Sequence, residues 1–138
     1  MSAEISLRLS AALDEIAQIH DGLGSFAAQE GWTSKLEFEV ILVVEELFTN
    51  VVKYGGCPGE PVRIDVTSEP NRVTIEMADS GRPFDPLADT PEPDTTSPVE
   101  DRAPGGLGLH LALTMTDELS YRRDGDFNRL TLVKRREE

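Results

Sequence analysis

The chain has 138 residues, a net charge of −13 and an apolar fraction of 38%. This length suits one domain with a hydrophobic core, and we expect residues 1–138 to form a single domain. Such acidity disfavours direct DNA or RNA binding, and it favours basic partners or simply keeps the domain soluble. No apolar run is long enough to cross a membrane, since the longest covers only residues 40–44. One cysteine, Cys57, and the lack of a signal-peptide pattern favour the cytoplasm.

The first half of the chain predicts one strand followed by two helices. Residues 4–9 alternate polar and apolar side chains, which indicates a strand. A helix is expected over residues 10–30, with Ser10 as its N-cap. A second, longer amphipathic helix is expected over residues 34–54, where Ser34 and Glu37 would form a capping box and glycines follow the end.

The second half predicts two hairpins separated by a polar segment. Residues 62–66 and 73–77 alternate around a turn, and residues 118–122 and 127–134 form the last hairpin. Residues 82–104 hold six of the nine prolines, so we expect a mobile lid there, followed by a short helix over residues 105–116. The predicted class is α+β: a two-layer α/β sandwich with helices on one face of a mixed, mostly antiparallel sheet.

Glu46 and Asn50 form the first candidate site. They are four residues apart on the long predicted helix, so they lie side by side at the edge of its apolar stripe. An amide oxygen can bind magnesium when phosphates and water complete the shell. A carboxylate one turn away could accept a proton from an attacking hydroxyl. Such a pair at a helix edge is also often only solvated.

Two glycine motifs follow. In Asp79-Ser80-Gly81 the aspartate could accept a hydrogen bond from an exocyclic amine such as adenine N6, and Gly81 would let a flat ring approach the backbone. The same tripeptide also favours an Asx turn. Gly105-Gly106-Leu107-Gly108 opens a predicted helix, where backbone N–H groups and the helix dipole suit phosphate, although a hinge is the alternative. The pattern matches neither a dinucleotide fingerprint nor a Walker A loop.

In this order the motifs resemble the GHKL ATPase superfamily. The match is closest to its small anti-sigma factor serine kinases, of the RsbW and SpoIIAB type, and it covers essentially the whole chain. Residues 79–86 and 105–111 look most like that group. The resemblance implies a Bergerat ATP-binding fold that uses ATP and Mg²⁺.

The resemblance also implies a role for each matched residue. Glu46 would be the general base, and Asn50 would bind magnesium and the phosphates. Asp79 and Gly81 would form the adenine pocket, with Thr131 of the last strand near adenine. The other residues expected to bind ATP are Lys53, Arg102, Gly105, Gly106, Leu107 and Gly108.

The members of this family hold a sigma factor and phosphorylate a serine of a STAS-domain antagonist, and many are homodimers. We therefore expect a bacterial anti-sigma factor with serine-protein kinase activity, acting by partner switching in transcription regulation. One alternative is a nucleotide-holding binding module with little or no phosphotransfer, and another is a GHKL ATPase of unrelated role. Glu46 favours the kinase, because a module that only binds has no chemical need for that base.

Overall fold

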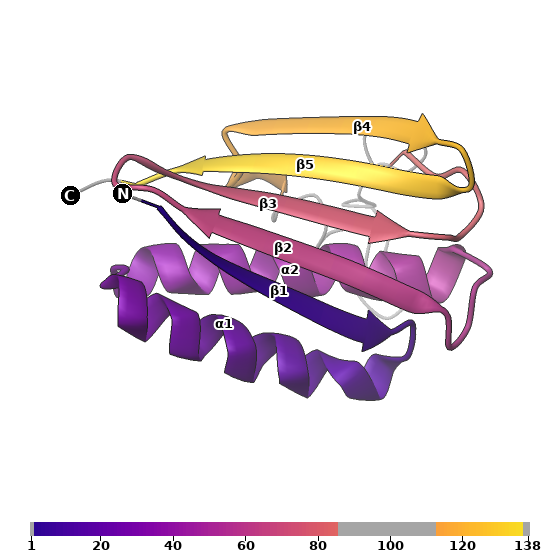
Figure 1. The fold of residues 1–138 in the computed structure, drawn as a ribbon, viewed down its shortest axis with the longest axis horizontal. Coiled ribbons are helices and arrows are strands. Elements are labelled where there is room, and N and C mark those ends of the chain that lie inside the picture. The colour runs from indigo at the N-terminus through magenta and orange to yellow at the C-terminus, as the bar shows by residue number, and fades with distance from the viewer. Residues whose placement is uncertain (1, 86–112, 137–138) are drawn as a thin grey trace, which may run out of the picture.

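The computed structural model describes residues 2–85 and 113–136 (Figure 1). A single antiparallel sheet has the strand order β1-β2-β3-β5-β4, and two long helices cover one of its faces. The elements are β1 (Ala3–Ser10), the 3-10 helix η1 (Leu13–Glu15), α1 (Ile16–Glu30), α2 (Ser34–Tyr54), β2 (Pro61–Ser68), β3 (Arg72–Asp79), β4 (Glu118–Asp124) and β5 (Phe127–Arg135). The α+β prediction is confirmed, and the four strand pairings described are all antiparallel rather than mixed.

Strand alternation decides which side chains enter the core. In β2 the residues Val62, Ile64 and Val66 are completely buried against the helices, while the residues between them face away. Helix α2 presents an apolar stripe to the same layer, and Phe48 is its largest fully buried side chain. The outer face of the sheet is consequently polar, as the hydrophobic pattern predicts. None of the helices in the described ranges combines the length and apolarity needed to cross a bilayer.

Both predicted helix caps are wrong, although the bounds of α2 are as predicted. Thr33 keeps an extended backbone and its Oγ1 accepts a hydrogen bond from the Leu36 N–H at 3.1 Å, so Thr33 is the N-cap. Ser34 is already helical and cannot form the expected capping box. Ser10 is the last residue of β1, and its N–H donates to Glu15 Oε1 at 3.0 Å. Strand pairing therefore extends through Ser10, and α1 begins only at Ile16, after the 3-10 helix.

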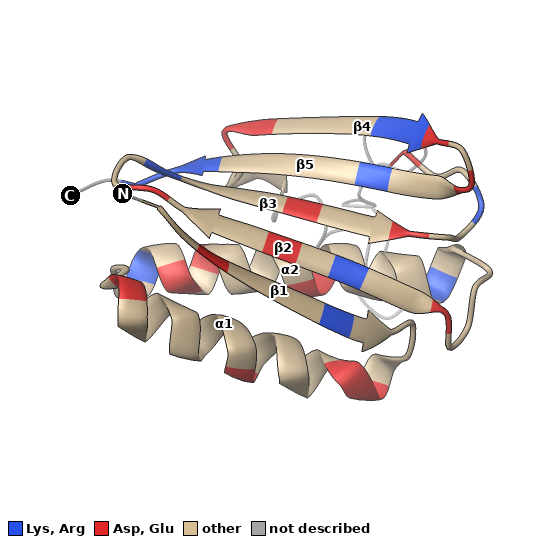
Figure 2. Ribbon diagram, viewed as in Figure 1, with Lys and Arg blue, Asp and Glu red and all other residues tan. Residues whose placement is uncertain are grey.

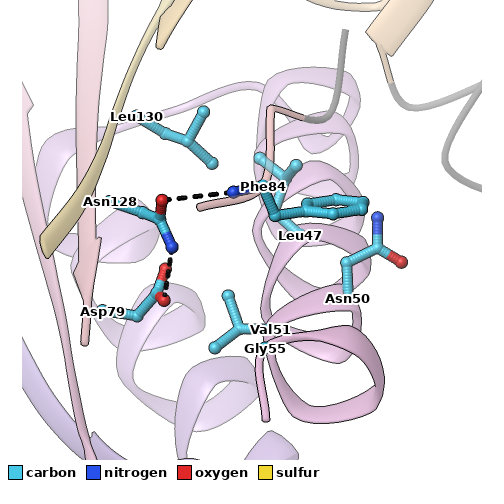
Figure 3. A pocket seen from close by; sticks show the side chains of 8 residues that line it. All are labelled: Leu47, Asn50, Val51, Gly55, Asp79, Phe84, Asn128 and Leu130. Atoms are coloured by element: carbon cyan, nitrogen blue, oxygen red, sulfur yellow. Dashed lines mark hydrogen bonds between the residues drawn. The ribbon is translucent and has the colours of Figure 1, made fainter. Parts of the chain in front are cut away.

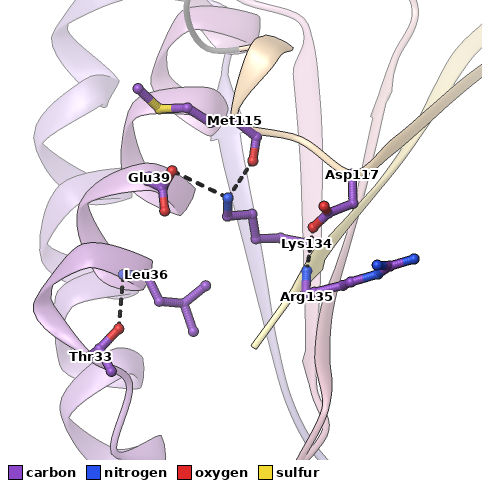
Figure 4. Close-up of polar contacts among 7 residues, drawn as sticks. All are labelled: Thr33, Leu36, Glu39, Met115, Asp117, Lys134 and Arg135. Carbon is purple, nitrogen blue, oxygen red and sulfur yellow. Dashed lines mark hydrogen bonds and ion pairs between the residues drawn. The ribbon is translucent and has the colours of Figure 1, made fainter. Parts of the chain in front are cut away.

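A partly buried ion pair ties β5 to α2 beside the start of β4 (Figure 4). Lys134 Nζ lies 3.2 Å from Glu39 Oε2, and these side chains are only 17% and 13% exposed. The same ammonium group donates to the backbone carbonyl of Met115, and Asp117 Oδ2 accepts from the Arg135 N–H at 2.6 Å. Leu113 and Thr114 are helical, so the helix expected over residues 105–116 ends two residues earlier than predicted; its earlier part lies outside the described residues.

Candidate functional site

A pocket opens between the C-terminal turns of α2, the end of β3 and the start of β5 (Figure 3). Its enclosed cavity is small, about 20 Å³. Its walls are mostly apolar, with polar groups contributed by Asn50, Asp79 and Asn128. The remaining lining residues are Leu47, Val51, Gly55, Phe84 and Leu130. An apolar cleft with a few converging polar groups is the usual form of a small-molecule site.

Asp79 ends β3 and places a buried carboxylate in this pocket, with only 4% of the residue exposed. Its Oδ1 accepts hydrogen bonds from the Gly81 N–H at 2.9 Å and from Asn128 Nδ2 at 3.0 Å. The Asx turn that Asp-Ser-Gly favours is therefore present, and it orients the carboxylate. Both bonds use Oδ1, so within the described residues Oδ2 keeps its lone pairs for a further donor.

Asn128, which no sequence pattern indicated, makes more hydrogen bonds than the other polar side chains of the pocket. It is 4% exposed, and its Nδ2 donates to Asp79 Oδ1 and to the Arg82 carbonyl at 2.8 Å. Its Oδ1 accepts from Tyr121 Oη at 2.6 Å, from Arg123 at 3.2 Å and from the Phe84 N–H at 3.3 Å. One buried amide thus links β3, β4, β5 and the residues that follow Asp79. Its place in the site follows from strand register, which pairs Asn128 with Asp79 and is not visible in the sequence.

The backbone at Gly81 lies close to Gly55, which lines the pocket. A Cβ at Gly81 would lie 2.8 Å from the Gly55 carbonyl oxygen and 2.9 Å from Asp79 Oδ1. The Arg82 N–H donates to the same Gly55 carbonyl at 2.9 Å. Gly81 is required here by the backbone that follows α2, which is a reason the sequence does not show.

Residues 82–85 are the described start of the predicted lid, and they contact the end of α2 by ring stacking and a hydrogen bond. The Phe84 ring stacks on Tyr54 with centroids 5.9 Å apart and an interplanar angle of 16°. Arg82 Nε also donates to the Tyr54 carbonyl. Phe84 therefore forms one wall of the pocket near Asn50 (Figure 3). The rest of the predicted lid lies outside the described residues.

Asn50 and Glu46 lie one turn apart on α2, as predicted. Asn50 is only 7% exposed, and its buried Nδ2 has no hydrogen-bond partner among residues 2–85 and 113–136. An unpaired buried amide is costly unless a ligand pairs with it. Glu46 is half-buried and is not among the residues that line the pocket. Burial raises the pKa of Glu46, Lys53 lowers it and Glu45 raises it further. A raised carboxyl pKa is typical of a group that exchanges protons near neutral pH.

The structure does not bring every predicted residue to the pocket. Thr131 pairs with Glu76 on the outer face of the sheet, and it alternates with the inward-facing Leu130. Lys53 is exposed on the last turn of α2. Arg102 and Gly105, Gly106, Leu107 and Gly108 lie outside the described residues. Across the parts of the chain that are described, no three His, Cys, Asp or Glu side chains gather into a possible metal site.

Comparison with known proteins agrees with this geometry. Residues 9–134 match the family described as the histidine kinase-like ATPase domain. The serine/threonine-protein kinase BtrW of Bordetella bronchiseptica is 31% identical over 132 residues, which cover 94% of this chain and 89% of BtrW. The serine-protein kinase RsbW of Halalkalibacterium halodurans is 26% identical over 123 residues, covering 87% of this chain and 76% of that protein. The expected resemblance and enzyme class, a protein serine/threonine kinase, are confirmed by these relatives.

Two solved structures share the fold. The RsbU and RsbW domains of Rv1364c from Mycobacterium tuberculosis superpose with a TM-score of 0.64 and 15% identity. That match covers 97% of this chain and 32% of the other, so the chain spans about a third of that protein. The histidine kinase AdeS of Acinetobacter baumannii superposes with a TM-score of 0.53, 13% identity and coverage of 97% and 68%. Because the family match extends from residue 9 to residue 134, the chain belongs to the histidine kinase-like ATPase domain family.

Proposed function

We propose that this protein is a magnesium- and ATP-dependent serine kinase that phosphorylates a STAS-domain protein and holds a sigma factor in a partner-switching module. The observation that carries the proposal is the buried Asn50 Nδ2, which has no partner in the described part of the chain and lies in the same pocket as the oriented carboxylate of Asp79. Asn50 is one turn from Glu46. The relatives BtrW and RsbW, which are named protein kinases, support transfer to a protein hydroxyl. We also expect a homodimer.

The residues of the pocket fit a nucleotide with its metal ion. Asp79 Oδ2 would accept a hydrogen bond from the adenine amine, while Asn128 and the Gly81 N–H hold Oδ1. Leu47, Val51 and Leu130 supply apolar contacts for the ring. Rotation of the Asn50 amide would present its oxygen to magnesium and its Nδ2 to a phosphate oxygen, which would satisfy the atom that is now unpaired. Bound magnesium would neutralise charge on the phosphates during transfer.

Glu46 is proposed to act as the general base. Its raised pKa makes the carboxylate more basic than an ordinary glutamate, and it would accept the proton of the attacking serine hydroxyl. The oxygen freed of that proton would form a bond to the terminal phosphorus as the bond to the leaving ADP oxygen breaks. The chain's own part is to position the nucleotide and to hold that proton.

A phosphotransfer assay with labelled ATP, magnesium and the STAS-domain protein encoded nearest this gene tests the proposal. Glu46→Gln keeps the shape of the side chain and removes its basicity, so we expect transfer to slow by at least ~10²-fold with little change in ATP affinity. Glu37→Gln is the matched control, because Glu37 lies in the first turn of α2, away from Glu46, and should not affect transfer.

Transfer by Glu46→Gln at the wild-type rate would remove Glu46 as the base. If the wild type binds Mg-ATP and the STAS protein without any transfer, the binding module becomes the better description.

A further inference from the structure

We propose that the outer face of the sheet, on the side away from the helices, is a docking surface for an acidic helical segment of a partner protein. Four arginines form this surface, and we call them the arginine row: Arg8, Arg63, Arg129 and Arg122. The surface is distinct from the nucleotide pocket, because Asp79 and Asn128 point to the opposite face of the sheet.

Strand register places these arginines in one line across all five strands. Arg8 of β1 pairs with Arg63 of β2, which pairs with Ala78 of β3. Ala78 pairs with Arg129 of β5, and Arg129 pairs with Arg122 of β4. Figure 2 shows the resulting line of blue bands, interrupted only at β3. With neighbouring strands ~4.8 Å apart, the row is roughly 19 Å long.

The side chains of the row are accessible. The Arg63 and Arg129 side chains are 53% and 42% exposed, and Arg8 and Arg122 are exposed as well. Ala78 is the small residue at the middle of the row, and a hollow of about 250 Å³ lies over it. The charged residues that line the hollow are Arg63, Arg122 and Arg129, with Asp65 and Glu76 at its side. The arginine row is therefore accessible to the side chains of a partner protein.

Folding alone does not account for this arrangement. Arg8–Arg63 and Arg122–Arg129 are like charges directly opposite one another, which destabilises a sheet. The chain has 13 lysine and arginine residues against 26 acidic residues, yet four of the 13 stand in this one row. Opposing arginines would be stabilised by carboxylates supplied from outside.

The charges of the row are only partly neutralised within the protein. Arg63 Nε lies 2.9 Å from Asp65 Oδ2, and Arg129 Nε lies 2.9 Å from Asp124 Oδ2. Both pairs are exposed, so they are weak and can exchange for another carboxylate. Arg8 and Arg122, at the ends of the row, make no hydrogen bond or ion pair with residues 2–85 or 113–136.

Charge complementarity favours an acidic protein segment over other occupants. Asp65 and Glu76 stand on the same face, two residues along their strands from Arg63 and Ala78, so a long polyanion would meet carboxylates as well as arginines. Nucleic acid carries a charge at every phosphate, whereas a short helix can place its few carboxylates over the arginines alone. Acidic side chains on one face of a helix are ~5–6 Å apart, close to the spacing between strands, so they would fit a row of this length.

The test uses the full chain and a fluorescent helical peptide of ~14 residues, ~21 Å long, with glutamates along one face. A peptide with glutamine at those positions is its control. We expect saturable binding of the glutamate peptide alone, with amide NMR shifts at β1, β2, β4 and β5. Arg8→Thr/Arg122→Thr should weaken binding at least ~10-fold, because two charge-assisted contacts are lost. Arg72→Thr, on the same face ~20 Å along β3 from Ala78, should change it less than ~2-fold.

Several results would overturn the proposal. One is the absence of saturable peptide binding, and another is an equal loss of peptide affinity in Arg72→Thr. A third is a wild-type dimer, seen by sedimentation, that becomes a monomer in the double variant, because the occupant of the surface would then be a second copy of this chain. Lower Mg-ATP affinity in the double variant would show that the arginine row is not separate from the nucleotide pocket. Unchanged Mg-ATP affinity together with lost peptide binding supports a separate surface, whether or not the protein is a kinase. If the double variant does not fold, Arg122→Thr alone gives the same comparison.

Discussion

Asn128 Nδ2 donates a hydrogen bond to Asp79 Oδ1 across 3.0 Å, and both residues are 4% exposed. This contact joins β5 to the end of β3 at the point where we place adenine. The same amide holds the Arg82 carbonyl and the Phe84 N–H, so the carboxylate and the first residues after it are fixed together. The orientation of Asp79 consequently depends on a residue in the last hairpin.

Asn128→Asp should weaken Mg-ATP binding by at least ~10-fold. The substitution keeps the shape of the side chain, but it turns a donor toward Asp79 and the Arg82 carbonyl into an acceptor. Isothermal titration calorimetry measures the change. Asn71→Asp, in the exposed turn before β3, is the control and should bind Mg-ATP like the wild type. Equal affinity in both variants would show that Asn128 does not orient the site.

Asp79 should make the pocket prefer ATP over GTP. Guanine presents a carbonyl oxygen where adenine has its amine, and two facing acceptors leave buried groups unpaired at a cost of ~1–3 kcal/mol. Competition against a fluorescent ATP analogue should therefore need far more GTP than ATP. Asp79→Asn should reduce the difference between the ATP and GTP affinities, because an amide can donate a hydrogen bond as well as accept one. Asp65→Asn, on the outer face, is the control. If GTP competes as well as ATP with the wild type, adenine does not lie against Asp79.

Gly81→Ala should destabilise the fold by on the order of 1–3 kcal/mol, because the added methyl group would clash with backbone atoms. The nearest atom, the Gly55 carbonyl oxygen, would be 2.8 Å away. Gly24→Ala is a useful contrast, since its Cβ would meet only Glu37 Oε1 at 3.7 Å and the helix should gain ~1 kcal/mol. Urea unfolding of the two variants measures both effects. A Gly81→Ala protein as stable as the wild type would contradict the close approach to Gly55.

Glu46→Gln should change how stability depends on pH. Burial raises the pKa of Glu46 in the folded state, so the stability linked to its proton is present at low pH and is lost as pH rises through that raised value. The Gln variant has no such loss. Its free energy of unfolding should therefore match that of the wild type below the ordinary glutamate pKa of about 4.3 and exceed it at neutral pH. Urea unfolding across this range would contradict the account if the difference did not grow with pH.

The elements of the fold were largely predictable because they depend on local patterns. Alternation in residues 62–66 and 73–77 marks strands that the structure extends to Pro61–Ser68 and Arg72–Asp79. The stripe on residues 34–54 gives α2 its correct bounds. The caps were missed because Thr33 and Ser34 are both good N-cap residues, and only the backbone angles show which one is used.

The parts that depend on strand register could not be read from sequence. Asn128 pairs with Asp79, so Asn128 and Leu130 face the pocket while Thr131, three residues from Asn128, must face the other side. Without that register, the family resemblance alone placed Thr131 near adenine. The arginine row was hidden for the same reason, because its members are scattered between Arg8 and Arg129 in the chain.

Calorimetric titration of Mg-ATP into the wild type and Asn50→Ala tests whether Asn50 belongs to a magnesium–nucleotide site. In the described residues, its buried Nδ2 has no hydrogen-bond partner until such a ligand binds. Alanine removes the proposed ligand, so we expect Mg-ATP affinity to fall more than ~10-fold, equivalent to at least ~1.4 kcal/mol. Asn71→Ala, in the exposed turn before β3, should leave the affinity unchanged. A folded Asn50→Ala protein that binds Mg-ATP as tightly as the wild type would contradict the account.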